Sequence, residues 1–336
     1  MRLLLAVHNV YTEYASGAAR SMRTIMTWLH AAGHECRVLS TARFESTRGA
    51  VLHPHLAELG ITPQWREGRG PRGIGRYLRD GVDVTLLATR HHDLAAPDRA
   101  EGDQYLHVFD GILRDFRPDI VLSYGAHPVL HEALGWARAS GARTVFSVRK
   151  HGYDAPQWYR NADHVLATSA YMAREIAEKA GVAAAALPSP INWAEVTGTE
   201  ETRGFLTFVN PTLAKGVALF ARLADMLGQL RPDIPILIVQ STGEAAPLTR
   251  IPGVELARYP QIMVSPPMAR TADIFSLTRV LLVPSVFAEP FGRVAAEAMI
   301  NGVPALVSDR GGLPETVAEG GLVRRGDAAL GRRGGV

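Results

Sequence analysis

The sequence predicts an α/β protein built from two Rossmann-like domains, each with a doubly wound parallel sheet. Two observations carry this prediction: short apolar runs typical of buried strands recur along the chain, and amphipathic helical segments alternate with them. Parallel strands need a crossover connection, and helices of this length supply it. The chain of 336 residues is long enough to bury two such cores.

The N-terminal half contains the first set of alternating elements. Its first strand is predicted at residues 2–10 (RLLLAVHNV), and the helix that follows is expected to end at Gly33. Further helices are expected at residues 127–141 and 170–181. The remaining strands are predicted at residues 36–40, 83–88, 119–124, 143–148 and 163–168.

The C-terminal half repeats the alternation. Residues 203–240 are predicted to form a strand, a loop, an amphipathic helix and a second strand. A strand at residues 280–285 leads through the loop FAEPFG into a helix that closes at Asn301-Gly302. The next strand is expected at residues 303–308, and GGLPE opens another loop-helix junction.

Two prolines predict the division between the halves. Pro188 and Pro190 interrupt regular structure, so we expect domains at residues 1–190 and 204–336, joined by a linker at 191–203. The chain finishes in AALGRRGGV, which is rich in glycine and arginine and has no amphipathic period. We therefore expect a C-terminal domain with a shortened end.

Two carboxylates in the C-terminal half stand eight residues apart, Glu289 in the loop and Glu297 in the following helix. A rise of ~1.5 Å per helical residue lets both face one crevice, about 10 Å apart. The backbone amides of residues 291–294 form the helix N-terminus between them and favour an anion such as a diphosphate. Because carboxylates accept hydrogen bonds from paired hydroxyls, the arrangement suits a nucleotide sugar. The alternative is that Glu289 is a solvated loop charge and Glu297 a surface residue of the helix.

This segment closely resembles the E-x7-E signature of the retaining nucleotide-sugar glycosyltransferases of family 4. The matching residues are Pro284, Ser285, Glu289, Phe291, Gly292, Glu297, Ala298, Gly302, Pro304, Gly311, Gly312 and Glu315. The resemblance implies two Rossmann-like domains facing a cleft (the GT-B architecture). It also implies a nucleotide-diphosphate sugar as donor, with UDP the commonest base, and transfer to an acceptor hydroxyl with retention at the anomeric carbon.

The resemblance assigns roles to residues on both sides of the signature. Glu289 would hold the sugar hydroxyls, Glu297 the ribose diol and Lys215 the leaving diphosphate, where a cation offsets developing charge. The family's usual arginine, five residues before this lysine, is Asn210 here, and Arg293 is a candidate replacement cation. The predicted donor-binding residues are Gly17, Asn210, Lys215, Glu289, Phe291, Gly292, Arg293 and Glu297.

The N-terminal half contributes two further candidates. The loop YTEYASGAAR resembles the family's glycine-rich loop, although the usual Gly-Gly is Ser16-Gly17 here, and Gly17 would allow close approach to the donor phosphates. His151 follows a predicted strand near the position of a family histidine that contacts the donor sugar, so we add it to Glu289 and Lys215 as a catalytic candidate. His8 is a weaker alternative.

Absent patterns narrow the chemistry that the sequence predicts. The sequence contains no D-x-D motif and no Cys/His ligand cluster, so we expect a mechanism without a bound metal and no cofactor besides the donor. A dinucleotide-dependent oxidoreductase is disfavoured because no G-x-G-x-x-G follows the first strand. A sugar-nucleotide epimerase and a non-catalytic nucleotide-sugar-binding relative stay open as alternatives.

Composition indicates the setting of the protein. Its net charge of +3 is much smaller than the positive charge typical of nucleic-acid-binding proteins. Its single cysteine, Cys36, fits a reducing cytoplasm. The start of the chain does not read as a secretory signal. The sequence leaves three classes of acceptor open: a small molecule, a glycan or a lipid-linked sugar. Five scattered arginines would suit peripheral contact with an anionic membrane, although we prefer a solvated face: Arg66, Arg69, Arg72, Arg76 and Arg79.

Overall fold

The computed structural model divides into two compact units, Met1–Pro190 and Ile191–Val336, which are described separately. The structure describes residues 1–45, 50–66, 73–92, 99–199, 203–241, 248, 251–268 and 270–324. The glycine- and arginine-rich chain end predicted to shorten the second domain lies outside these residues, as do Arg69 and Arg72. Among the described residues, no helix is long and apolar enough to cross a membrane.

Unit 1 is a nine-stranded sheet, as far as its described residues show, in the order β3-β4-β5-β2-β1-β6-β7-β8-β9. All neighbours pair in parallel except β3 with β4 and β4 with β5. The strands are β1 (Arg2–Ala6), β2 (Glu35–Thr41), β3 (Gln64–Arg66), β4 (Ile74–Arg79), β5 (Val82–Leu87), β6 (Ile120–Ser123), β7 (Arg143–Val148), β8 (His164–Ala167) and β9 (Ala185–Ala186).

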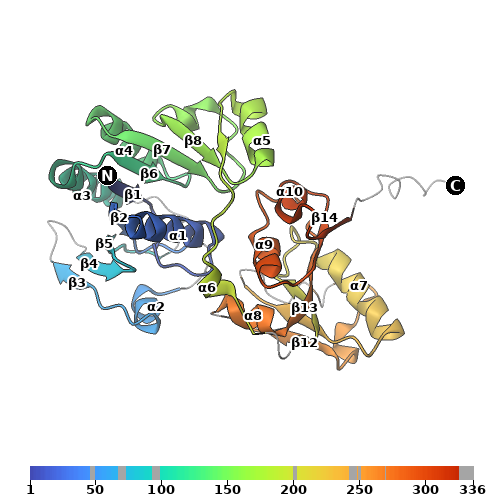
Figure 1. Ribbon diagram of the computed structural model, residues 1–336. Helices are drawn as coiled ribbons and strands as arrows, with labels where there is room; N and C mark the ends of the chain where they lie inside the picture. Colours follow the sequence, from blue (N-terminus) through green and yellow to red (C-terminus); the bar gives the residue numbers. More distant parts are fainter. Residues whose placement is uncertain are drawn as a thin grey trace. The chain divides into compact units, whose positions relative to one another are not determined.

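Helices cover both faces of this sheet (Figure 1). Alternation along β1 assigns the two cores: Leu4 packs with Tyr105, whereas Leu3 and Leu5 pack with Met22 on the opposite face. The helices of unit 1 are α1 (Gly17–Ala31), α2 (Leu52–Glu58), α3 (Arg99–Phe116), α4 (Pro128–Ala139), the 3-10 turn η1 (Pro156–Tyr159) and α5 (Ala170–Ala180).

Unit 1 adds an antiparallel edge, β3-β4-β5, to the predicted parallel sheet. β4 and β5 are joined at Asp80-Gly81, which both have positive φ, at 53° and 80°. Asp-Gly is a strong signal for a tight hairpin turn, so the sequence could have predicted this one. The same hairpin contains two of the five arginines considered for membrane contact, and both form ion pairs: Arg76 with Asp83 and Arg79 with Asp80. Membrane contact therefore stays a prediction without support from these two residues.

Unit 2 is a six-stranded parallel sheet, within its described residues, in the order β12-β11-β10-β13-β14-β15. The strands are β10 (Phe205–Val209), β11 (Ile236–Val239), β12 (Ile262–Ser265), β13 (Thr278–Val283), β14 (Ala305–Ser308) and β15 (Leu322–Arg324). The helices are α6 (Trp193–Val196), α7 (Val217–Leu230), η3 (Leu256–Arg258), α8 (Thr271–Leu277), α9 (Arg293–Ile300) and α10 (Leu313–Val317).

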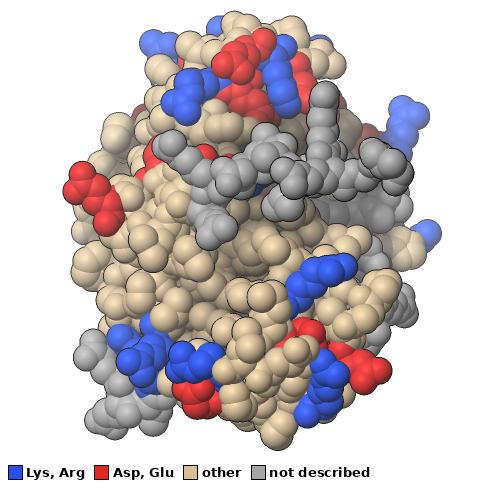
Figure 2. Space-filling model, turned by 90° about the vertical axis from the view of Figure 1, so that its right-hand side faces the viewer, with Lys and Arg blue, Asp and Glu red and all other residues tan. Residues whose placement is uncertain are grey.

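The outer face of α7 carries three exposed apolar side chains. Leu219, Met226 and Leu230 are exposed along it, while Phe220 and Ala224 point into the core. Figure 2 views the molecule from the right-hand side of Figure 1 and shows most charged side chains toward the top and bottom of that view.

The strand order of unit 2 reverses between β10 and β13. Ligands of open α/β sheets bind beyond the carboxyl ends of the strands at such a switch point.

Candidate active site

The loops after β10 and β13 meet at this switch point of unit 2. Gly216, with φ of 81°, lies so close to the β13 loop that a Cβ atom there would stand 1.9 Å from the Pro284 carbonyl oxygen. The Val286 amide donates to the Ala214 carbonyl at 3.0 Å and fixes the two loops together. Glycine after Lys215 is thus required by both the left-handed conformation and the close backbone approach.

Lys215 and Glu289 form an ion pair across these two loops. The Lys215 Nζ atom lies 2.6 Å from Glu289 Oε1 and 2.8 Å from Oε2. Ser285 donates its hydroxyl to Glu289 Oε1 at 2.6 Å, and the Phe287 ring lies 5.0 Å from the lysine nitrogen. Glu289 is 4% exposed, so the alternative of a solvated loop charge is wrong for this residue.

The glycine pair of the signature holds the backbone of Glu289. The Gly312 amide donates to the Glu289 carbonyl at 2.7 Å. Gly311 has φ of 63°, and a Cβ there would stand 2.3 Å from the same carbonyl oxygen. The sequence marks these glycines only as motif matches, whereas the structure shows that they fix the loop that presents the carboxylate.

Glu297 is the second buried carboxylate, 3% exposed on α9. The Arg293 Nε atom donates to its Oε1 at 2.7 Å, one helical turn earlier. The alternative of a surface residue is therefore wrong for Glu297 as well. The predicted replacement cation, Arg293, is at least partly engaged with this carboxylate, and both lie in the first two turns of a helix whose N-terminus favours anions.

The remaining predicted residues of unit 2 shape the backbone. Asn210 adopts φ of 63°, and its carbonyl accepts from the Thr212 amide at 2.8 Å, so it turns the chain after β10. Asparagine tolerates this left-handed conformation better than most residues, which gives the departure from arginine a structural reason. Gly292 caps α9 with φ of 98°, and the Phe291 carbonyl accepts from the Thr316 hydroxyl.

The predicted residues of unit 1 lie at the carboxyl edge of its own sheet. Ser16 caps α1 by accepting from the Ala19 amide at 3.1 Å, and its hydroxyl donates to Glu45 at 2.8 Å. Its φ of −85° needs no glycine, which explains why serine precedes Gly17. His151 Nδ1 donates to Glu175 Oε1 at 2.8 Å, which orients the imidazole ring from α5.

His8 is a buried histidine of the sheet edge. Its ring stacks on His127 with centroids 3.7 Å apart, and Nδ1 is enclosed without a hydrogen-bond partner. Burial above all, with the neighbouring His127 and Arg43, lowers the pKa of His8 to about 3. The side chain is therefore a neutral imidazole near neutral pH.

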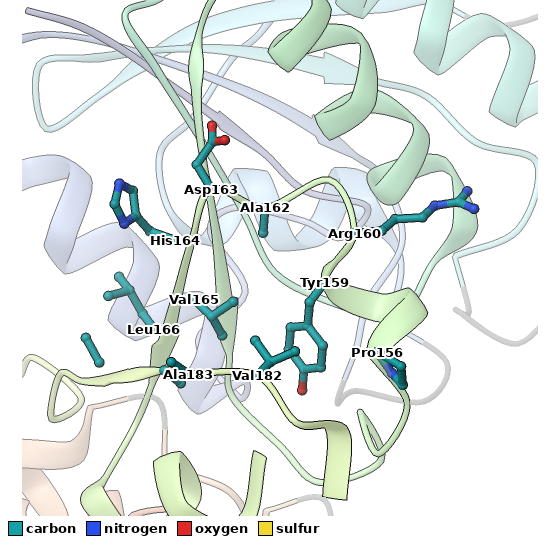
Figure 3. A pocket seen from close by; sticks show the side chains of 12 residues that line it. Pro156, Tyr159, Arg160, Ala162, Asp163, His164, Val165, Leu166, Val182 and Ala183 are labelled. Atoms are coloured by element: carbon teal, nitrogen blue, oxygen red, sulfur yellow. The ribbon is translucent and has the colours of Figure 1, made fainter. Parts of the chain in front are cut away.

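A hollow of about 680 Å³ lies elsewhere in unit 1, between η1, β8 and the segment before β9 (Figure 3). Valines, alanines and Tyr159 form most of its lining. The Asp163 carboxylate at its rim already accepts from the Thr144 amide at 2.9 Å and pairs with Arg138 at 3.1 Å. The hollow brings together none of the predicted site residues, so we do not place the active site there.

Two family profiles match the chain, one over most of unit 1 and one over most of unit 2. The sequence profile of Glycosyltransferase Family 4 matches residues 15–192, more than half of the chain. The chain belongs to glycosyltransferase family 4. The profile described as "Glycosyl transferases group 1" matches residues 191–329 of this family 4 chain.

A curated relative of this family 4 chain is the D-inositol 3-phosphate glycosyltransferase of Rhodococcus erythropolis, 37% identical over 103 residues. The matched segment covers 31% of this chain and 19% of that relative, so the likeness spans about a fifth of the relative's length.

Solved structures establish the fold of the family 4 chain as GT-B. A glycosyltransferase from Rickettsia africae ESF-5 superposes with a TM-score of 0.65 at 14% identity, covering 96% of this chain and 83% of that one. Anabaena Alr3699/HepE in complex with UDP-glucose gives 0.64 at 14% identity, with coverages of 96% and 85%. The catalytic domain of starch synthase IV from Arabidopsis thaliana, bound to ADP and acarbose, gives 0.60 at 13% identity, with coverages of 94% and 84%.

Sequence reasoning missed one residue that the geometry brings to the centre of this site. Ser285 was noted only as a motif match, yet its hydroxyl reaches the Glu289 carboxylate and is 2% exposed. Its place at the end of a predicted buried strand, at the carboxyl edge where ligands bind, was the available signal.

Proposed function

We propose that this protein is a retaining glycosyltransferase that moves a sugar from a nucleotide-diphosphate donor to an acceptor hydroxyl. The observation that carries the proposal is the pairing of two buried carboxylates, Glu289 and Glu297, with the cations Lys215 and Arg293 at the switch point of unit 2. A nucleotide sugar offers groups of both kinds, hydroxyls for carboxylates and a diphosphate for cations.

We assign the donor contacts residue by residue. Lys215 and the amides at the N-terminus of α9, from Phe291 through Gly292 to Arg293, would bind the diphosphate. Glu289 would accept hydrogen bonds from sugar hydroxyls and Glu297 from the ribose diol. The Lys215 Nζ atom lies 2.6 Å from Glu289 Oε1. This one cation can therefore contact both the carboxylate that holds the sugar and the leaving diphosphate.

The proposed reaction proceeds on the front face of the sugar. The bond from the anomeric carbon to the diphosphate oxygen breaks, the acceptor oxygen bonds to the same face, and the acceptor proton passes to the departing phosphate. Positive charge already in place at Lys215 stabilises the phosphate as its negative charge develops. We assign to His151, whose ring Glu175 orients at 2.8 Å, a hydrogen bond to the donor sugar. Gly17 would let the first loop of unit 1 approach the donor.

We further propose that this chemistry needs no metal and uses UDP as the donor base. Lys215, Arg293 and the α9 N-terminus supply the positive charge that a metal would otherwise provide. The UDP-glucose complex of the Anabaena relative favours UDP, while the ADP complex of starch synthase IV makes ADP the necessary comparison. We place the reaction in the cytoplasm, in keeping with the single buried Cys36.

Thermal unfolding with UDP, GDP and ADP, each alone and with EDTA, tests the donor site. A nucleotide at a hundred times its Kd stabilises the fold by about 2.7 kcal/mol, which shifts the midpoint by several degrees. We expect one nucleotide to raise the unfolding midpoint of the wild-type protein by this amount. The same nucleotide should not raise the midpoint of Glu297→Gln. Absence of a shift with all three, or an unchanged shift in Glu297→Gln, would remove the basis of the proposal.

A non-catalytic nucleotide-sugar-binding protein is the second candidate, favoured by Asn210 in place of the family's arginine. Donor turnover separates the two candidates. A protein that is stabilised by the intact nucleotide sugar but neither hydrolyses nor transfers it over hours would be a binding protein.

A further inference from the structure

A small hollow in unit 1 has the chemistry of a sugar-binding pocket. Its volume is about 200 Å³. It lies beyond the carboxyl ends of β1 and β2, where their loops meet α2, so it occupies the sheet edge at which ligands of α/β folds bind. The lining residues are Glu13, Tyr14, Phe44, Ala50, Val51, Pro54, His55 and Glu58.

Three aromatic side chains, Tyr14, Phe44 and His55, are among the lining residues and contact one another. Tyr14 stacks near His55 with centroids 5.5 Å apart, and Phe44 meets the same imidazole edge-on at 5.1 Å. The His55 Nε2 atom is held by the Thr12 hydroxyl at 3.1 Å. Burial lowers the pKa of His55, so this ring is neutral near neutral pH. Phe44 and His55 are buried, whereas the partly exposed ring of Tyr14 can pack against the apolar C–H face of a sugar ring.

The acidic groups of the lining are two carboxylates, Glu13 and Glu58. Glu13 is 1% exposed, and its Oε2 accepts from the Glu45 amide at 2.8 Å, which fixes its orientation. Glu58 ends α2 at the exposed rim. Burial raises the pKa of Tyr14, and the charges of Glu58 and Glu13 raise it further. No lysine or arginine lines the hollow among the described residues, although Arg23 of α1 acts on His55 from further away.

We propose that this hollow binds the acceptor and selects a neutral or amine-bearing sugar or polyol ring over a phosphorylated one. Carboxylates accept hydrogen bonds from hydroxyls and attract an ammonium group, whereas two negative charges in a partly enclosed site disfavour a phosphate. A volume equal to about seven waters suits a single ring. The inference rests on the proposed glycosyl transfer and extends it to the acceptor class.

The test compares one ring in three charge states: glucose, glucosamine and glucose 6-phosphate. Binding to the full chain is followed by ligand-observed NMR, and transfer is followed from UDP-glucose. We expect glucose or glucosamine to bind at least tenfold more tightly than glucose 6-phosphate. Equal or tighter binding of the phosphate, or no binding by all three rings, overturns the proposal.

A charge reversal at the rim supplies the decisive comparison. Because Glu58 is exposed, Glu58→Lys should fold normally and shift the preference toward glucose 6-phosphate by at least tenfold. Glu132→Lys, on an exposed position of α4, is the matched control and should leave the preference unchanged. An unchanged preference in Glu58→Lys excludes the pocket. Hydrolysis of UDP-glucose without acceptor tests the donor site separately. If the wild-type protein does not hydrolyse UDP-glucose, that result counts against the proposed function and not against the acceptor pocket.

Discussion

Ser285 and Lys215 hold the same carboxylate oxygen, Glu289 Oε1, each at 2.6 Å. The serine hydroxyl comes from the loop after β13 and the lysine from the loop after β10, so the loops of two neighbouring strands fix one carboxylate. The lysine has to serve the leaving diphosphate in the proposed reaction. The serine contact does not compete with that role, and it keeps Glu289 oriented when the lysine turns to phosphate.

Ser285→Ala should therefore impair sugar handling without impairing nucleotide binding. A hydrogen bond to a charged group contributes about 1.5–3 kcal/mol, so we expect kcat/KM for UDP-glucose turnover to fall roughly 10- to 100-fold. Stabilisation by UDP alone should be unchanged. Ser308→Ala is the control, because it removes a hydroxyl that donates to the Ser285 carbonyl at 2.6 Å and reaches no carboxylate. Equal losses in the two variants would reduce Ser285 to a structural residue.

The sequence could predict the carboxylates of this site, but not the partners that lie far away in the chain. Glu289 and Glu297 lie in a dense, register-locked signature, so their positions followed from local pattern. The pairing of Arg293 with Glu297 spans four helical residues and was readable, as was the Asp80-Gly81 hairpin. The contacts of Lys215 with Glu289 and of Ser16 with Glu45 join loops far apart in the chain. Their pairing depends on strand order, which spacing alone does not supply.

Gly216→Ala should be more damaging than an ordinary glycine substitution. Its left-handed φ alone costs about 1–2 kcal/mol for alanine, and the new Cβ would also overlap the Pro284 backbone. We expect a loss of at least about 3 kcal/mol in urea unfolding, together with loss of UDP-dependent stabilisation. Gly33→Ala is the matched control, since its φ of 89° is similar and a Cβ there meets nothing within 4 Å. Similar losses in both variants would mean that the contact with Pro284 does not matter.

Asn301→Asp should destabilise unit 2 by about 2–4 kcal/mol. The Asn301 Nδ2 atom donates to the carbonyls of Val196 at 2.9 Å and Glu297 at 2.8 Å, and an aspartate would turn an oxygen toward both. Its Oδ1 accepts from the Gly198 amide at 2.8 Å, a contact that aspartate can keep. Urea unfolding measures the loss, and protonation should restore part of it near pH 4. A variant as stable as wild type at pH 7 would show that these donor contacts contribute little.

His8 should make the folded protein sensitive to acid. Its folded pKa of about 3 lies below the ordinary value of 6.5, so between these values the unfolded chain binds a proton that the folded chain excludes. Stability conferred by the neutral ring is thus complete above pH 6.5 and is lost as the pH falls toward 3, by up to about 1.4 kcal/mol per pH unit.

His8→Gln removes this group and tests the sign directly. Urea unfolding between pH 7.5 and pH 5 should show a shallower fall in stability for the variant than for wild type, whatever the baseline loss from the altered packing. His127 and His131, whose pKa values are also lowered by burial, should leave a residual slope in the variant. Substitution of the exposed His107 of α3 by glutamine controls for loss of an imidazole at the surface. Parallel curves for wild type and His8→Gln would mean that the buried ring at the end of β1 does not take part in the acid response.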